Sequence, residues 1–441
     1  MKKIILIATS ILLVFIVGFS IIASIFLKPI AKDLIQTQLA EQGYQNATIG
    51  DISVGLHKTT ITDIALNNPG QTKIGELSVS YWPLQLVNKR IDTVTISNST
   101  IDVFIKKNGD VLVADYLVYN LLTAQTKIQK TGNNYNQSNF SLIKKAHAAT
   151  PTPSLPLESI AADDLNLTIK TPSGKQIKTT IDANYSISSN SVEGNVVTKD
   201  TDMTSLMELI SLVKPTAVTG VNITSGAFSS DIAFSLKDIS KPTNIDGSGT
   251  VTVKDLSLTK DGIGVQKLNT QIDIANILPF STKSDQKVTI EAITKSIVTA
   301  RNIAAVFGLK DTTKLDLNSL FLNLSGGTIS TSPFKTDLKN INGVVDVSLK
   351  EINLLDFSKL LGLGVLIKGE VNADIPVKIV DNKVVIDRST INLLIASITG
   401  ANIEKTATDL IDGVIKGGDD GAKAARDVLN GFIGGFGGSK K

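Results

Sequence analysis

The sequence predicts a mainly β protein: a long repetitive array of strands that follows one N-terminal transmembrane helix and includes a few short helices. Two observations lead to this class. Apolar and polar residues alternate with a period of two along most of the chain, as in strands with one apolar and one wet face. Aromatic residues make up only 5% of the 441 residues, so Ile, Val and Leu, which suit pleated surfaces, fill most apolar positions.

The transmembrane helix is predicted from an uncharged run between Ile4 and Leu27 that follows Lys2 and Lys3. At about 1.5 Å per residue this run is roughly 36 Å long, enough to cross the hydrocarbon core of a bilayer. Bulky residues at its end offer no small-x-small cleavage site, which favours an uncleaved anchor over residues 1–28. The basic N-terminus and the long downstream chain favour an orientation with the N-terminus inside and the body outside.

The remaining chain is predicted to divide into four segments. Residues 29–125 form an N-terminal β module that begins with a short helix over residues 29–42. Residues 126–157 are polar and punctuated by proline, as expected of a loop or linker. Residues 158–400 form the long β part, and residues 401–441 form a helical, glycine-rich tail.

Turns and short helices interrupt the alternation at defined places. The Asn-Gly pair at 108–109 and the Asp-Asn pair at 381–382 each separate two alternating runs and predict hairpin turns. Residues 203–213 and 356–363 have apolar residues at helical spacing and predict short helices. Each helix precedes a β stretch that contains glycine, which agrees with an array built from like units.

Composition excludes several classes of function. The 44 Lys and Arg residues nearly balance the 41 Asp and Glu residues, which is not the basic footprint of a nucleic-acid binder. The chain has no Cys, so thiolate metal sites, disulfides and cysteine nucleophiles are excluded. His57 and His147 are isolated, and Asp163-Asp164 lacks the spacing of an acid/base pair. We therefore expect no enzymatic activity, no cofactor, no metal and no nucleic-acid partner.

Two groups of motifs carry a resemblance to a known family. Residues 47–69 read ATIGDISVGLHKTTITDIALNNP, and residues 73–110 begin KIGELSVSYWPLQLVNKR. Near the C-terminus, residues 322–337 read LNLSGGTISTSPFKTD, residues 347–363 read VSLKEINLLDFSKLLGL, and residues 369–400 begin GEVNADIPVKIV. The order of a strand pair, an Asn-Pro turn, a short helix and a strand ending in I-P-V resembles the AsmA-like family of bacterial envelope proteins, closest to its YdbH-like, TamB-related members.

The resemblance implies a bridge-like carrier of phospholipids between the inner and outer membranes. In that family the sheet curls into an open, taco-like groove with an apolar wall, along which acyl chains slide while headgroups stay wet. It also implies an inner-membrane protein with one span and a periplasmic body. The apolar residues that we expect to line the groove are Ile101, Val103, Ile105, Val251, Val253, Leu320, Leu322, Leu324, Val345, Val347, Leu349, Ile375, Val377 and Ile379.

Alternatives remain open at this point. Alternation of Ile and Val is also found in closed β-sandwich cores, and a closed dry core would suit a membrane-anchored periplasmic scaffold that assists outer-membrane assembly. The chain is shorter than the usual members of the family. Because an open terminal strand favours pairing with another chain, we hypothesise that an outer-membrane lipoprotein or another protein adds strands at the C-terminal end.

Overall fold

The computed structural model of the chain confirms the mainly β class. Two compact units divide the chain: unit 1 holds residues 1–201, 208–217 and 231–246, and unit 2 holds the rest. Within these units the structure describes residues 32–33, 35–37, 39–40, 46–66, 72–82, 90–113, 116–120, 157–241, 243–295, 298–356, 369–385, 393 and 396–399.

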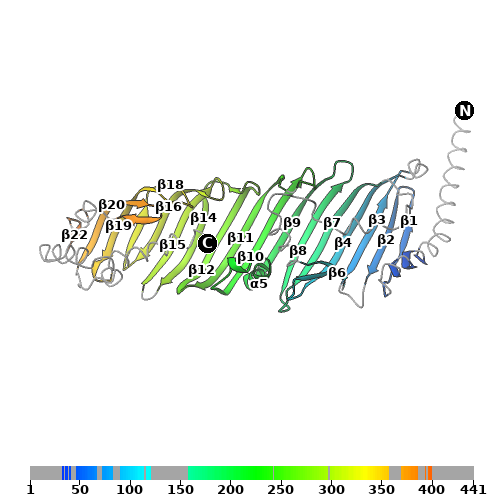
Figure 1. Ribbon diagram of the computed structural model, residues 1–441, viewed down its shortest axis with the longest axis horizontal. Coiled ribbons are helices and arrows are strands. Elements are labelled where there is room, and N and C mark those ends of the chain that lie inside the picture. Colours follow the sequence, from blue (N-terminus) through cyan, green and yellow to red (C-terminus); the bar gives the residue numbers. More distant parts are fainter. Residues whose placement is uncertain are drawn as a thin grey trace, which may run out of the picture. The chain divides into compact units, whose positions relative to one another are not determined.

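Unit 1 is built on an open, mostly antiparallel sheet (Figure 1). The strands pair in the order β1–β2–β3–β4–β7–β8–β9, and β5 and β6 extend the sheet beside the end of β4. Their bounds are β1 (Ile52–Val54), β2 (Lys58–Ala65), β3 (Lys73–Ser80), β4 (Ile91–Ile105), β5 (Asp110–Val113), β6 (Tyr116–Asn120), β7 (Leu157–Lys170), β8 (Gln176–Ser186) and β9 (Ser191–Asp202).

The pairing of β4 with β7 is parallel, whereas every other pairing described in this unit is antiparallel. The register runs from Ile91 opposite Leu157 to Phe104 opposite Lys170. A parallel neighbour requires a crossover connection rather than a hairpin. Strands that precede and follow the polar segment 126–157 therefore lie side by side in one sheet.

Unit 2 contains a second run of antiparallel strands. They pair in the order β11–β12–β14–β15–β16–β17–β19–β20, while β13, β18, β21 and β22 pair beside the ends of longer strands. Their bounds are β11 (Ile245–Lys260), β12 (Ile263–Asn276), β13 (Ser281–Thr282), β14 (Gln286–Lys295), β15 (Val298–Leu309), β16 (Lys314–Leu324), β17 (Gly327–Thr331), β18 (Phe334–Asp337), β19 (Gly343–Asn353), β20 (Glu370–Val380), β21 (Lys383–Val385) and β22 (Ile398–Thr399). Strand β10 (Val221–Leu236) contributes residues to both units.

Both predicted hairpin turns are confirmed. Gly109 has a φ of 78° and its N–H donates to the carbonyl of Lys106 at 2.9 Å, which closes the turn between β4 and β5. Asp381 and Asn382 have φ values of 51° and 63°, and they connect β20 to β21. Two successive residues with positive φ are the geometry of a type I′ turn, which suits the twist of paired strands.

The helix predicted at residues 203–213 is confirmed as α5 (Met203–Val213). Asp202 caps its N-terminus, because the Thr204 N–H donates to the Asp202 carboxylate at 2.7 Å. Residues 354–356 are helical at the start of the second predicted helix, whose remainder lies outside the described residues.

The predicted helix at residues 29–42 is supported where the structure describes it, because residues 32–33, 35–37 and 39–40 are helical. Ile35 and Leu39 pack against a cluster of buried residues on β1, β2 and the segment before them: Ile49, Ile52, Ile61 and Ile64. This helix therefore covers the first strands of unit 1.

The predicted transmembrane anchor and the C-terminal tail lie outside the described residues. Among the residues that are described, no helix combines the length and the apolar character needed to cross a bilayer.

A single residue with positive φ interrupts the interior of many strands. Asp164 in β7 (φ 52°), Asp255 in β11 (50°) and Glu351 in β19 (58°) are examples, and φ is also positive at Asp63, Asn98, Asp200, Lys267 and Asn302. In β7 the register moves at this residue, so that Ala162 pairs with Ala183 whereas Leu165 pairs with Ile181. The register also shifts at Asp255, Lys267, Glu351 and Asn302, so each of these residues and Asp164 lies at a β-bulge.

The bulges keep the apolar side chains on one face. Ala183 and Ile181 are two residues apart on β8 and project from the same face, so their partners Ala162 and Leu165 must also share a face although they are three residues apart. Side chains on the apolar face of β7 accordingly have even residue numbers before Asp164 and odd residue numbers after it. A strand longer than about ten residues can thus bend with the sheet without turning its apolar face to water.

Candidate functional site: an apolar sheet face

The register of unit 2 places one continuous row of side chains on a single face. Residues that pair directly in antiparallel strands project from the same side of the sheet, so successive pairs trace a row from strand to strand. The row crosses β11, β12, β14, β15, β16, β17, β19 and β20 through Val253, Thr270, Val288, Ala305, Leu320, Thr331, Val347 and Ile375. Eight strands are seven intervals of about 4.8 Å, so the row is roughly 34 Å long.

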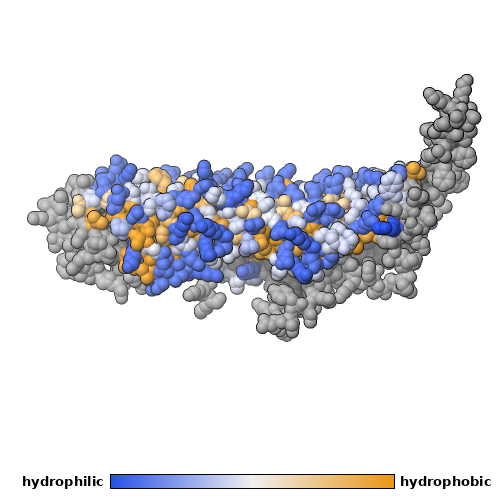
Figure 2. Space-filling view, turned by 90° about the horizontal axis from the view of Figure 1, so that it is seen from above, coloured by the Kyte–Doolittle hydropathy of each residue, from blue (hydrophilic) through white to orange (hydrophobic). Residues whose placement is uncertain are grey.

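The side chains of this row are partly open to solvent. Seven of the eight are half-buried, and only Ile375, which is 7% exposed, is buried. A second row on the same face runs beside it through Leu256, Leu268, Ile290 and Ile303. Figure 2 shows hydrophobic surface in orange patches bordered by blue hydrophilic side chains. The face is therefore apolar. The first row is only partly covered, whereas Leu256, Ile290 and Ile303 of the second row are buried.

Unit 1 contains a row of the same kind. It passes through β1, β2, β3, β4, β7, β8 and β9 at Ile52, Ile61, Leu77, Ile96, Ala162, Ala183 and Gly194. The beginning of the row is covered, because Ile52 and Ile61 are 2% and 6% exposed beneath the helical residues 35–39. Ile96 and Ala162 are half-buried farther along the row.

The structure groups the fourteen predicted lining residues into two sets. Ile101, Val103 and Ile105 project from one face of β4 in unit 1, and the other eleven share the apolar face of unit 2. Eight of the fourteen are half-buried, and six are buried: Ile105, Leu322, Val345, Leu349, Ile375 and Ile379. That these residues bind lipid stays a prediction.

Sequence reasoning missed the strands in the middle of unit 2. Val288, Ala305 and Thr331 belong to the long row, and Ile290 and Ile303 are buried beside it, 5% and 4% exposed. The bulges hide these residues from a search for strict alternation. An Asp or Asn between an even-numbered and an odd-numbered apolar run, as at Asn302, is the signal that would have found them.

The opposite face of unit 2 carries exposed charged side chains as well as exposed apolar ones such as Phe321 and Val344. Lys267 on β12 forms an ion pair with Glu291 on β14 at 2.6 Å, and both side chains are more than 45% exposed. The hydrogen bond to Glu291 raises the pKa of Lys267, and the charges of Glu291 and Asp255 act in the same direction. Exposed pairs of this kind add little stability but keep this face hydrated.

The comparisons with known proteins decide the family. The family model described as YdbH-like, intermembrane phospholipid transport protein YdbH, matches residues 119–392, which is more than half of the chain. The chain belongs to the YdbH-like family. No curated protein and no solved structure gives a match.

The YdbH-like match covers the site described above. Residues 119–392 include every strand of the long row in unit 2 and strands β7 to β9 of unit 1. All three C-terminal segments that carried the resemblance begin within the match, whereas the N-terminal motifs at 47–69 and 73–110 precede it. The family described for this chain is one of lipid transport between membranes.

Proposed function

We propose that the protein is a passive bridge for phospholipids between the inner and outer membranes. In this proposal the sheet curls around its apolar face, and acyl chains slide along the groove that results. The observation that carries the proposal is the row from Val253 to Ile375 across eight neighbouring strands. Its side chains are apolar and half-buried, except for the polar Thr270 and Thr331 and the buried Ile375.

The energetic requirement for transport explains the need for a continuous row. Burial of one methylene group stabilises the buried state by about 0.8 kcal/mol. Transfer of an acyl chain of about 15 methylenes into water therefore costs roughly 12 kcal/mol of free energy. A continuous apolar strip removes most of this barrier along its length. Val, Ala, Leu and Ile side chains make no directional contacts, so we expect little selectivity among acyl chains.

The scaffold alternative predicts a closed, dry core. Such a core exists at the C-terminal end of unit 2, where Ile352 and Val371 are 1% and 3% exposed and pack with Leu349, Leu354 and Ile375. A second buried cluster, formed by Ile290, Ala300, Ile303 and Leu322, lies beside the row, but the row's own side chains from Val253 to Val347 stay half-buried. This difference favours transport over the scaffold function.

Anchoring and partners complete the proposal. The uncharged segment at residues 4–27 would hold the chain in the inner membrane, with its body in the periplasm. At the other end, β21 and β22 are three and two residues long and, in the described part of the chain, pair with five of the eleven residues of β20. Such an edge favours addition of a strand from another protein, for example an outer-membrane lipoprotein.

Ala304 and Ala305 offer a matched test of the proposal. They are adjacent on β15, both are half-buried, and they project from opposite faces: Ala305 pairs with Leu320 in the row, whereas Ala304 pairs with Phe321 on the other face. Transfer of a fluorescent phospholipid is measured from vesicles that carry the full-length chain to acceptor vesicles.

We expect Ala305→Asp to reduce the rate at least tenfold, because a carboxylate in the row must be passed by every acyl chain. Ala304→Asp should transfer lipid at the parent rate. Equal rates for the parent and Ala305→Asp, with both proteins folded by circular dichroism, would reject the apolar face as the route.

A further inference from the structure

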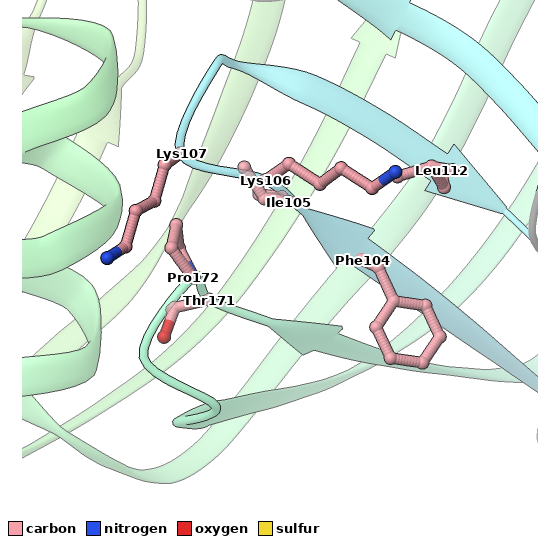
Figure 3. Close-up of a pocket in the computed structure, with 7 residues that line it drawn as sticks. All are labelled: Phe104, Ile105, Lys106, Lys107, Leu112, Thr171 and Pro172. Carbon is pink, nitrogen blue, oxygen red and sulfur yellow. The ribbon is translucent and has the colours of Figure 1, made fainter.

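A cavity lies at one end of unit 1, away from the apolar row. It has a volume of about 600 Å³ and lies between the turn that joins β4 to β5 and the turn that joins β7 to β8. Figure 3 shows its lining, in which the side chain of Lys106 extends toward Leu112 above the ring of Phe104. The residues that line the cavity are Phe104, Ile105, Lys106, Lys107, Leu112, Thr171 and Pro172.

The apolar floor of this cavity belongs to the other face of the sheet. Phe104 pairs directly with Leu112 of β5, so the two side chains project from the same face. Alternation along β4 places Val103 and Ile105 on the opposite face, the one that carries the apolar row. Among the lining residues Ile105 projects from the face of the row, whereas Phe104 and Leu112 offer apolar contact on the other face.

The carboxylates near the cavity are already engaged. Asp102 is 7% exposed and accepts a hydrogen bond at 2.6 Å from Lys170, whose ammonium group also lies 4.6 Å from the centre of the Phe104 ring. Glu208 accepts hydrogen bonds from Thr171 Oγ1 and from the N–H of Ser173, both at 2.9 Å.

Asp110, on the β5 side of the turn, accepts a hydrogen bond from Asn108 at 2.7 Å. Lys106 and Lys107 are exposed and form no ion pair with any described residue. The rim of the cavity thus carries two positive charges that nothing in the described part of the chain neutralises.

We propose that this cavity is a second lipid-binding site, which holds a phosphate-bearing amphiphile with its apolar part on Phe104 and Leu112 and its phosphate on Lys106. Lysine binds phosphate as a point charge, and a phosphate beside an apolar floor is the chemistry that distinguishes a phospholipid from both free phosphate and a neutral lipid. Lys107 points away from Lys106 and adds to the positive potential (Figure 3). The residues that carry the proposal, Phe104, Leu112 and Lys106, lie on the face opposite the row, and the site does not require the transport route to exist.

Photocrosslinking tests the proposal on the full-length chain in nonionic detergent. The probe is a lysophosphatidylglycerol with a photoactivatable group in its acyl chain, and the crosslinked peptides are identified by mass spectrometry. We expect saturable crosslinking to the segments around Phe104, Leu112 and Pro172. Lys106→Gln should weaken binding about tenfold, as expected for the loss of one charge-assisted contact, and Lys107→Gln should weaken it less. Lys178→Gln, at an exposed lysine on β8, is the matched control and should bind like the parent.

Competition identifies which part of the ligand is recognised. Unlabelled lysophosphatidylglycerol should displace the probe, whereas inorganic phosphate and monoacylglycerol at the same concentration should not. Equal competition by inorganic phosphate or by monoacylglycerol, or parent-like binding by the Lys106→Gln/Lys107→Gln double variant, would overturn the proposal. Ala305→Asp, which tests the transport route, should leave crosslinking at this cavity unchanged, so failure of one proposal is distinguishable from failure of the other.

Discussion

Gly75 on β3 lies directly against the backbone of Asn98 on β4. A Cβ atom built on Gly75 would stand 2.1 Å from the carbonyl oxygen of Asn98, a residue of β4 with a φ of 50°. The relationship recurs in unit 2, where a Cβ on Gly327 of β17 would stand 2.5 Å from the carbonyl oxygen of Glu351. In both places the facing residue has a positive φ, and glycine leaves the room that the close approach of its backbone requires.

Gly75→Ala should therefore destabilise unit 1. The added methyl group would collide with backbone atoms rather than with a flexible side chain. We therefore expect the free energy of unfolding to fall by about 2–4 kcal/mol and the thermal midpoint to be clearly lower. Gly264→Ala on β12 is the control, because the nearest atom to its Cβ is 3.9 Å away. Differential scanning calorimetry compares the two, and a midpoint for Gly75→Ala equal to that of Gly264→Ala would contradict the close approach.

Asp255 tests whether the bulge conformation itself constrains the sequence. Its φ of 50° lies in the left-handed region, which Asp, Asn and Gly adopt more readily than β-branched residues. We expect Asp255→Val to lower stability by about 1–3 kcal/mol and Asp255→Gly to cost much less. Chemical denaturation of both variants gives the comparison. Equal losses would show that contacts of the carboxylate, rather than its backbone, matter at this position.

Removal of Lys170 should leave a buried charge without its partner. The Asp102 side chain is only 9% exposed, and Lys170 lies 2.6 Å from it with a side chain that is 23% exposed. Lys170→Met should cost about 2–4 kcal/mol, which the second change Asp102→Asn should largely restore. Lys237→Met removes an exposed pair at 3.7 Å and should change stability by less than about 0.5 kcal/mol. The prediction is contradicted if the double variant Lys170→Met/Asp102→Asn is as unstable as Lys170→Met alone.

The stability of unit 1 should depend on pH through Glu208. Burial alone would raise the pKa of Glu208, but hydrogen bonds from Ser173 and Thr171 and the charge of Lys175 outweigh it and hold the pKa below 4.5. A carboxyl group whose pKa is lowered by folding stabilises the folded state above its unfolded pKa, and this contribution is lost as pH falls through the lowered value. At pH 7 the parent should have a higher thermal midpoint than Glu208→Gln, and in acid the two midpoints should converge. A difference that stays constant from pH 7 to pH 3 would refute this account.

Val347 and Val344 test the apolar face by lipid content. Val347 is half-buried in the row, whereas Val344 is 56% exposed on the other face of β19. Native mass spectrometry of the full-length chain from a Gram-negative host should detect bound phospholipids in the parent and in Val344→Asp. Val347→Asp should retain at most about half as many, because a charge in the row is costly to bury. Unchanged lipid content in Val347→Asp would place the bound lipid elsewhere.

The sequence by itself determined the mainly β class, helix α5 and both hairpin turns. These features depend on short-range patterns: apolar alternation in strands, apolar residues at helical spacing over 203–213, and the turn pairs at 108–109 and 381–382. The YdbH-like family was also recognisable from the order of the sequence motifs in this chain, and the family match confirms it.

Only the tertiary structure decided which strands share a face and where the face is covered. Alternation cannot be followed through Asp164 or Asp255, since a residue with positive φ shifts the phase, and only the partner strand shows that Val253 and Leu256 still project from the same side. The parallel pairing of β4 with β7 joins residues more than fifty positions apart, which no local pattern encodes. Burial depends likewise on chain segments distant in sequence. Ile375 is therefore buried, whereas Val347, its partner on the neighbouring strand, is half-buried.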